Sequence, residues 1–193
     1  ISTLRCGWEQ VMRPLMIEMI GGGKSDSALE QMVDEYIDQS TGIQTVYQMR
    51  WLAERVAEFR GPEAAKDEWW YKDEYNRRLM EQVKVRIASV KEGREDRLNY
   101  MIKGAEGFLK ALRDAGLELY LASGTDHCDV VKEVAVLGLT GYFNLIKGAP
   151  ERQASCSKEA VIRMIMKEKG LKGEELLLAG DGKVEIALGV ENE

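Results

Sequence analysis

One short polar segment of the sequence has the residue types of a phosphate-binding site. Ser123, Gly124 and Thr125 follow an apolar run at residues 117–122 and precede a helical pattern that begins at His127. A hydroxyl group and backbone N–H groups at the start of a helix form an anion site, because those N–H donors have no partner inside the helix. The segment therefore predicts binding of an anion such as phosphate.

Two charged residues farther along the chain would complete such a site. Asp181 comes directly after the apolar run at residues 176–179. A carboxylate at the end of a strand suits Mg²⁺, which prefers oxygen ligands and is bound by one or two carboxylates together with substrate phosphate. Lys158 opens a predicted helix, where its positive charge gains nothing from the helix dipole. A bound phosphate would give this lysine a partner.

Each of these features also has an ordinary explanation. One alternative is that residues 123–126 serve only as the cap of the next helix and that Asp181 is an ordinary turn residue. The alternative for Lys158 is a solvated position at the surface, which most lysines occupy. His127 is the one histidine of the chain, and we expect it to occupy the first turn of its helix rather than to act as a catalytic base.

The elements that position these residues alternate between strand and helix from about residue 99 onward. The pattern predicts helices at 105–115, 127–137 and 158–169, and strands at 117–122, 144–146 and 176–179. Such alternation indicates a parallel sheet with crossover helices. Binding sites in these sheets lie at the carboxyl ends of the strands, where the polar segments of this sequence are placed.

Residues 7–97 instead predict one helix after another. Ser27 and Glu30 have the spacing of a capping box, and apolar residues follow at helical intervals. Pro62 stands where a helix would start, and a long charged helix is predicted from about Glu63 to Val90, with Trp70 among its buried residues.

The order of the polar segments resembles that of the haloacid dehalogenase-like (HAD) hydrolase superfamily. The second motif of that family is a Ser or Thr at a strand end, which Ser123 resembles. Its third motif is a lysine, which Lys158 resembles, with Lys147 as the weaker match. Its fourth motif is an acidic pair of the GDxxxD kind, which Asp181 and Glu185 resemble.

The resemblance implies a fold and a division into domains. The expected fold is α/β, a Rossmann-like parallel sheet core with an inserted all-helical cap domain of the C1 type. The cap would comprise residues 7–97, and the core would comprise residues 1–6 and 98–193.

The resemblance also implies an activity, that of a Mg²⁺-dependent phosphatase working through an aspartyl-phosphate. Residues 123–125 would bind the phosphoryl oxygens through the Ser123 hydroxyl and the backbone N–H groups. Lys158 would neutralise charge on the nucleophile and the phosphate. Asp181, supported by Glu185, would hold Mg²⁺. The expected partner is a small phosphorylated metabolite.

The first motif of the family, DxDGT, does not occur in this sequence. That motif supplies the nucleophilic Asp and a second Asp that acts as general acid and base. The sequence opens with ISTLRCGWEQV, which resembles the residues that follow the motif. We therefore expect the motif to precede Ile1 in a longer parent protein, more of the core to follow Glu193, and a segment to be missing between Ile186 and Ala187.

Composition narrows the set of partners. The 27 Lys and Arg residues against 33 Asp and Glu residues give a net charge of −6, so nucleic acid and anionic membranes are not expected partners. No apolar run approaches the roughly 18 residues needed to cross a bilayer. Three cysteines without a CxxC pair indicate neither a disulfide framework nor a zinc site, and a cytoplasmic location is expected.

Other functions remain open from the sequence. A non-catalytic binding or scaffold protein on the same fold is one alternative, because fold alone does not determine function. A dehalogenase-type or phosphomutase-type member of the same superfamily is another. The acidic pair Asp181 and Glu185 argues against a metal-free dehalogenase, because within this family only phosphoryl chemistry needs Mg²⁺.

Overall fold

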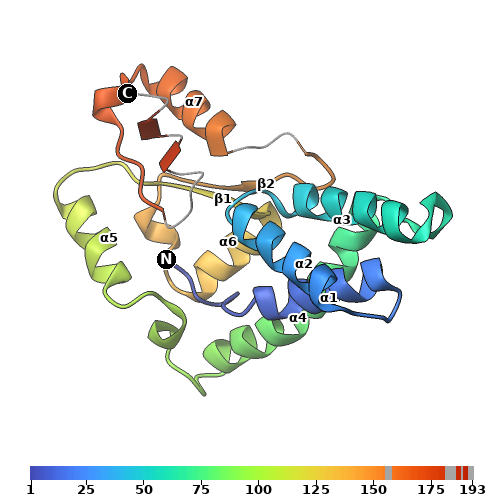
Figure 1. Ribbon diagram of the computed structural model, residues 1–193. Helices are drawn as coiled ribbons and strands as arrows, with labels where there is room; N and C mark the ends of the chain where they lie inside the picture. Colours follow the sequence, from blue (N-terminus) through green and yellow to red (C-terminus); the bar gives the residue numbers. More distant parts are fainter. Residues whose placement is uncertain (155–157, 181–185, 188, 191–193) are drawn as a thin grey trace.

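The computed structural model describes residues 1–154, 158–180, 186–187 and 189–190. Its helices and strands alternate only in the second half of the chain (Figure 1). The α-helices are α1 (Glu9–Gly21), α2 (Ser27–Gln39), α3 (Thr45–Arg60), α4 (Glu68–Lys91), α5 (Ala105–Asp114), α6 (His127–Val136) and α7 (Lys158–Lys169). The strands are β1 (Tyr120–Asp126) and β2 (Leu145–Ala149), and the short 3₁₀ helices are η1 (Pro62–Ala64), η2 (Arg97–Tyr100), η3 (Thr140–Tyr142) and η4 (Gly173–Glu175).

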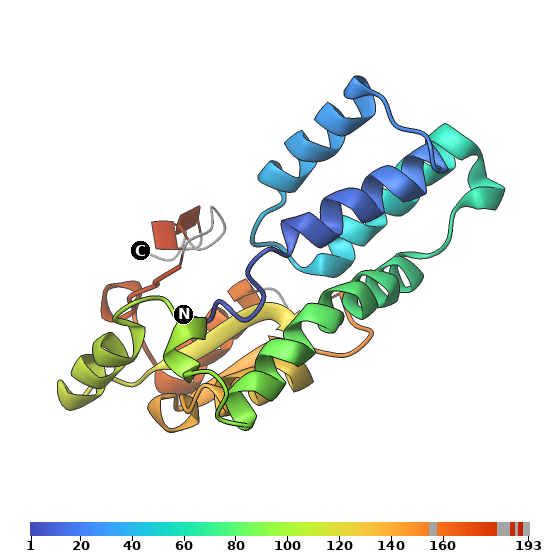
Figure 2. The same cartoon turned by 90° about the horizontal axis from the view of Figure 1, so that it is seen from below.

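Helices α1–α4 lie together on one side of the molecule and share one apolar core (Figure 2). Helix α2 shows why they form, because its buried residues Leu29, Val33 and Ile37 recur every four positions. The Asp26 side chain accepts a hydrogen bond from the Leu29 N–H and so caps this helix. The predicted capping residue, Ser27, is instead the first residue of the helix. The shared core includes Met12, Leu15, Met16, Ile20, Val33, Met49, Leu52, Val56, Tyr71, Leu79 and Val83.

The predicted helix from Glu63 to Val90 is divided in the structure. Pro62 opens the short η1, and α4 begins only at Glu68, where the Asp67 side chain caps it by accepting hydrogen bonds from the Trp69 and Trp70 N–H groups. Trp70 was predicted to be buried, and this was wrong, because 43% of it is exposed while its neighbour Tyr71 fills the core. Three aromatic residues in a row leave the buried face undetermined, and packing against the shared core selects the third.

The second half of the chain forms a parallel pair of strands with α6 as the crossover helix. Tyr120 pairs with Leu145 and Ala122 with Lys147, and pairing resumes at Asp126 and Ala149 after an irregularity. A second apolar core lies under these elements and includes Leu4, Met101, Leu109, Val130, Val134, Leu137 and Leu139. The two cores fall largely on opposite sides of residue 99, where the sequence changes from consecutive helices to alternating strands and helices. The exact boundaries of the two domains stay predictions.

The strand predictions differ from the structure, and the strand predicted at 144–146 is observed at Leu145–Ala149. The first strand lies at Tyr120–Asp126 rather than at 117–122, so the polar residues 123–125 fall inside it, where pairing with β2 is interrupted. Residues 176–179 form no strand, and they pair with neither strand of the two-stranded sheet that the described residues build. None of the helices in the described ranges is long and apolar enough to cross a membrane.

Candidate active site

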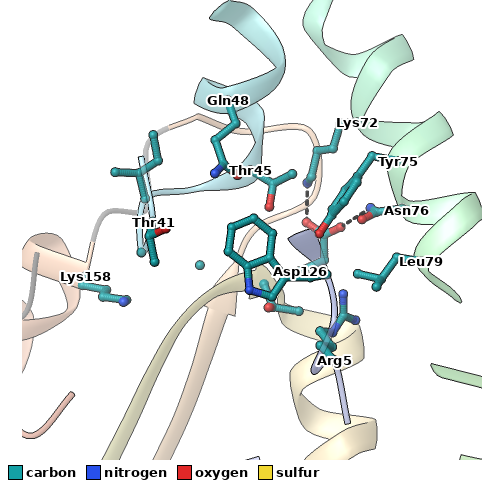
Figure 3. A pocket seen from close by; sticks show the side chains of 15 residues that line it. Arg5, Thr41, Thr45, Gln48, Lys72, Tyr75, Asn76, Leu79, Asp126 and Lys158 are labelled. Atoms are coloured by element: carbon teal, nitrogen blue, oxygen red, sulfur yellow. Dashed lines mark hydrogen bonds and ion pairs between the residues drawn. The ribbon is translucent and has the colours of Figure 1, made fainter. Parts of the chain in front are cut away.

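A cavity of about 270 Å³ lies between the helices of the first half and the carboxyl end of β1 (Figure 3). Its lining combines the N-terminal segment, the start of α3, one face of α4, the end of β1 and the start of α7. The lining residues are Arg5, Trp8, Thr41, Gly42, Ile43, Thr45, Gln48, Lys72, Tyr75, Asn76, Leu79, Gly124, Thr125, Asp126 and Lys158. The volume suits a small molecule.

Three of the predicted phosphate-binding residues line this cavity. Gly124 and Thr125 reach it from β1, and Lys158 reaches it from the first turn of α7. Buried Val161, Ile162 and Ile165 fix α7 and so fix Lys158 at its start. In Figure 3, Lys158 lies on one side of the cavity, and Lys72 lies on the other. The structure thus brings together residues that are more than thirty positions apart in the sequence.

Ser123 adjoins this group and acts on the local backbone. Its Oγ accepts a hydrogen bond from the Thr125 N–H at 3.2 Å. The chain at Gly124 passes close to the segment before α3, because a Cβ built on Gly124 would lie 3.4 Å from the Ile43 carbonyl oxygen. These contacts hold residues 123–125 in the stretch where β1 leaves its regular pairing with β2.

Asp126 receives two side chains of α4. Lys72 forms an ion pair with Asp126 Oδ1, and the Asn76 Nδ2 donates to Asp126 Oδ2 at 3.1 Å. The Asp126 carboxylate makes no capping hydrogen bond to α6. Capping of the next helix, the ordinary explanation for residues 123–126, is therefore not what this side chain does.

Sequence reasoning missed Lys72 and Asn76. One signal was present, since both residues belong to the face of α4 that also carries Tyr71, Tyr75 and Leu79, which are buried. A lysine on a buried face needs an anionic partner. Nothing in the local pattern shows that this partner is Asp126, which is 54 residues away.

Arg5 binds two acidic residues of α6 beside the cavity. Its Nε lies 2.8 Å from Glu133 Oε1, and its Nη2 lies 2.9 Å from Asp129 Oδ2. Burial disfavours the charged guanidinium, but the hydrogen bond and charge of Glu133, together with Asp129, outweigh it and raise the pKa of Arg5. Arg86 of α4 donates to the carbonyls of Leu4 and Cys6 at 2.7 and 2.9 Å, which fixes the backbone on both sides of Arg5.

Tyr75 is the aromatic side chain of α4 that lines the cavity beside Asn76. Burial raises the pKa of the Tyr75 hydroxyl above its usual value of 10.0. The phenol therefore stays neutral at physiological pH. Together with Leu79 it gives this part of the cavity an apolar wall.

The remaining candidates lie elsewhere. Lys147 is exposed on β2 and does not line the cavity. The Nδ1 of His127 accepts a hydrogen bond from the Gly148 N–H at 3.2 Å, so this ring links α6 to β2. Asp181 and Glu185, the predicted metal ligands, lie outside the described residues. Among the residues that the structure does describe, no three His, Cys, Asp or Glu side chains form a group able to hold a metal ion.

The sequence matches a known family over most of its length. Residues 24–190 match the haloacid dehalogenase-like hydrolase family. The chain belongs to this family. A comparison with curated proteins gives no significant match.

The fold is similar to that of solved structures. The crystal structure of a predicted phosphatase from Clostridium acetobutylicum superposes with a TM-score of 0.61 at 16% identity, covering 96% of this chain and 74% of that one. A structure from Clostridium difficile, whose phosphatase assignment is likewise a prediction, gives a TM-score of 0.49 at 14% identity over 95% of this chain and 74% of that one. The first likeness confirms the predicted fold class, an α/β Rossmann-like core with a helical cap.

Proposed function

We propose that this HAD-like hydrolase is a phosphatase that acts on a small phosphorylated metabolite. One observation carries the proposal: a single cavity is lined by Gly124 and Thr125 at the end of β1, by the ammonium group of Lys158, and by residues of helices α3 and α4. Backbone N–H groups and a lysine are the groups that bind phosphoryl oxygens. The membership in a hydrolase family supports the same reading.

The two sides of the cavity suggest different tasks. The core side offers Lys158 and the irregular end of β1, which suit the phosphoryl group and would stabilise its charge as the reaction proceeds. The helical side lines the cavity with the polar residues Thr41, Thr45 and Gln48, of which Thr41 donates to the Ile37 carbonyl oxygen and Gln48 to Ser40. Tyr75 and Leu79 form an apolar wall on this side. These side chains would hold the leaving group and exclude water from the reacting phosphorus.

The proposal includes Mg²⁺ and an aspartyl-phosphate, as the family resemblance implies. HAD superfamily members generally use Mg²⁺. The described residues alone do not supply a metal site, because they contain no group of three suitable side chains, and the Asp126 carboxylate is already held by Lys72 and Asn76. The metal ligands we propose are Asp181 and Glu185. The nucleophilic Asp would come from the family's first motif, which is not found in these 193 residues.

Hydrolysis of p-nitrophenyl phosphate by the protein made from its complete coding sequence tests the proposal. We expect Mg²⁺-dependent turnover in the wild type. Lys158→Ala should lower kcat/KM by about 100-fold, because it removes a fixed charge that contacts the transferring phosphoryl group. Lys147→Ala is the matched control and should stay within about twofold of the wild type, since this lysine is exposed outside the cavity.

Three outcomes would contradict the proposal. Equal losses in the two lysine variants would mean that Lys158 has no special role. Release of halide from haloacids without release of phosphate from any ester would favour a dehalogenase. Binding of inorganic phosphate without turnover by the complete protein would favour a binding protein on this fold.

A further inference from the structure

The ion pair between Lys72 and Asp126 joins the two halves of the molecule at the rim of the cavity. Its side chains are only 9% and 21% exposed. Removing two charges from water is costly, and a buried ion pair is often no more stabilising than an apolar pair of the same size. A gain in stability therefore does not by itself explain this ion pair. Because the pair lies beside the cavity, a role in function is the alternative explanation.

Asp126 occupies a sensitive place in the core. It is the last residue of β1 and follows directly after Gly124 and Thr125, the strand residues that line the cavity. Regular pairing with β2 is interrupted between Ala122 and Asp126, so the sheet does not hold this stretch through a continuous ladder. The contacts of Asp126 with Lys72 and Asn76 fix the far end of the stretch from the helical side.

The same face of α4 also holds the segment that follows β2. Arg152 forms an ion pair with Asp73 at 2.7 Å, and its guanidinium lies 5.8 Å from the centre of the Trp69 ring. Arg152 has a positive φ of 54°, which is uncommon for a residue with a side chain. The Tyr47 hydroxyl of α3 donates to the Ala154 carbonyl oxygen in the same segment. This segment lies between β2 and α7, which begins at Lys158.

The residues of α4 that make these contacts form one stripe. Trp69, Lys72, Asp73 and Asn76 stand at intervals of three and four, so they lie on neighbouring turns of one helix face. Through this stripe one rigid helix contacts the last residue of β1 and the segment that follows β2. Both segments lead to predicted phosphate-binding residues, because one follows Thr125 and the other precedes Lys158.

We propose that Lys72 and Asn76 are positioning residues, which set the geometry of residues 123–125 by holding the Asp126 carboxylate from α4. Lys72 acts through Asp126 and not by direct contact with substrate. The proposal rests on the proposed function only in its claim about phosphate. The mechanical part, that α4 restrains the end of β1, stands on the contacts alone.

Hydrogen–deuterium exchange separates the two parts of the proposal. The variants are Lys72→Met, which removes the charge and keeps the side-chain length, Asp126→Asn, and the two combined. Lys84→Met is the matched control, because Lys84 is an exposed lysine of the same helix. In Lys72→Met, amide exchange in peptides covering residues 121–128 should rise by about tenfold, a size typical of coupling between contacting residues. Exchange in α5 should not change.

Kinetics on p-nitrophenyl phosphate then test the link to phosphate. We expect kcat/KM to fall by about tenfold in Lys72→Met and in Asp126→Asn, and the double variant to be no worse than either single variant. Lys72→Arg should recover most of the loss, because it restores a cation that reaches the carboxylate. Multiplying losses in the double variant would show that Lys72 contacts substrate by itself and would overturn the positioning role.

Two further results decide the mechanical part. Unchanged exchange in residues 121–128 of Lys72→Met would refute it, whatever the activity of the protein. If Lys72→Met raises exchange throughout the chain, then Asn76→Ala provides the milder test, since it removes one neutral donor and leaves the ion pair in place. No effect of Asn76→Ala on residues 121–128 would then refute the proposal. A wild type without phosphatase activity would remove the proposed function and leave the exchange test unaffected.

Discussion

Arg5 allows a quantitative test of how the N-terminal segment is held against α6. The change is Arg5→Met, which removes the guanidinium and keeps an unbranched side chain. It leaves two carboxylates, Asp129 and Glu133, without their shared cation. The two acids are four residues apart on α6, so without Arg5 they also repel each other.

The magnitude follows from the burial of the three side chains. Exposed fractions are 18% for Arg5, 20% for Asp129 and 8% for Glu133. Breaking a buried ion pair by removing one partner costs about 3–5 kcal/mol. Because Arg5 and Asp129 keep some contact with water, we expect the lower end, a loss of about 3 kcal/mol in the free energy of unfolding.

Urea unfolding at pH 7 measures this loss by linear extrapolation. Replacing both acids as well, in Arg5→Met with Asp129→Asn and Glu133→Gln, should recover most of it, because no unpaired charge then remains. Arg94→Met serves as the control, since Arg94 pairs with Glu92 at the surface, where both side chains are more than half exposed. It should change stability by less than about 0.5 kcal/mol. A loss below about 1 kcal/mol in Arg5→Met, or no recovery in the triple variant, would refute the reasoning.

Two further predictions concern packing and pH. Gly148→Ala should lower the free energy of unfolding in urea by about 3 kcal/mol, because the added Cβ would lie 2.6 Å from the Thr125 carbonyl oxygen. Gly107→Ala is the control and should raise stability, because its Cβ meets open space and alanine favours helix α5. An equal effect of the two variants would contradict this prediction. Hydrogen bonds from Arg77 and then Arg78 lower the pKa of Glu74 from 4.5 to about 2, so its stabilising contribution is present above pH 4.5 and disappears as the pH falls toward 2. Glu74→Gln should therefore lower the free energy of unfolding by about 1 kcal/mol at pH 7 and by almost nothing near pH 2. Urea unfolding at both pH values measures the difference. A loss that does not depend on pH would show that the charge of Glu74 is not involved.

Much of the helical structure was predictable from local signals. Helix α7 was predicted with its observed limits, because a regular apolar stripe faces the core and Gly170 stops the helix. The same signals predicted α5 and α6 to within one residue. In these helices the apolar spacing and the helix-stop residues indicate the same limits, and the packed structure has those limits.

The strands were less predictable because a strand is defined by its neighbour. The apolar run at 117–122 located β1 only approximately, since its pairing with β2 begins at Tyr120 and continues into polar residues as far as Asp126. The run at 176–179 has a strand-like composition, but no described residues pair with it. Composition indicates that a segment can form a strand, and only the partner decides where it does.

The candidate site was predictable on its core side and not on its helical side. Ser123, Gly124, Thr125 and Lys158 stand beside strand ends and helix starts, where elementary rules already place anion-binding groups, and three of the four line the cavity. Their roles stay predictions until the lysine variants are measured. Lys72 follows no such rule, because its significance depends on a contact across 54 residues.

This difference has a physical consequence for how the site can vary. Lys158 is fixed by the packing of α7, and residues 123–125 are held by the Ser123 hydroxyl and, in our proposal, by the α4 contacts to Asp126, so neither depends on the residues that α3 presents to the cavity. The helical side is held to the core by ion pairs of α4. Lys72 of α4 pairs with Asp126 at the end of β1, and Asp73 of α4 pairs with Arg152 after β2. Substitutions on the cavity face of α3, at Thr45 or Gln48, can therefore change which leaving group fits while the α4 contacts that position residues 123–125 remain. In kinetic terms, variants at these two positions should alter KM differently for different phosphate esters, whereas Lys72→Met should lower kcat/KM for all of them by a similar factor.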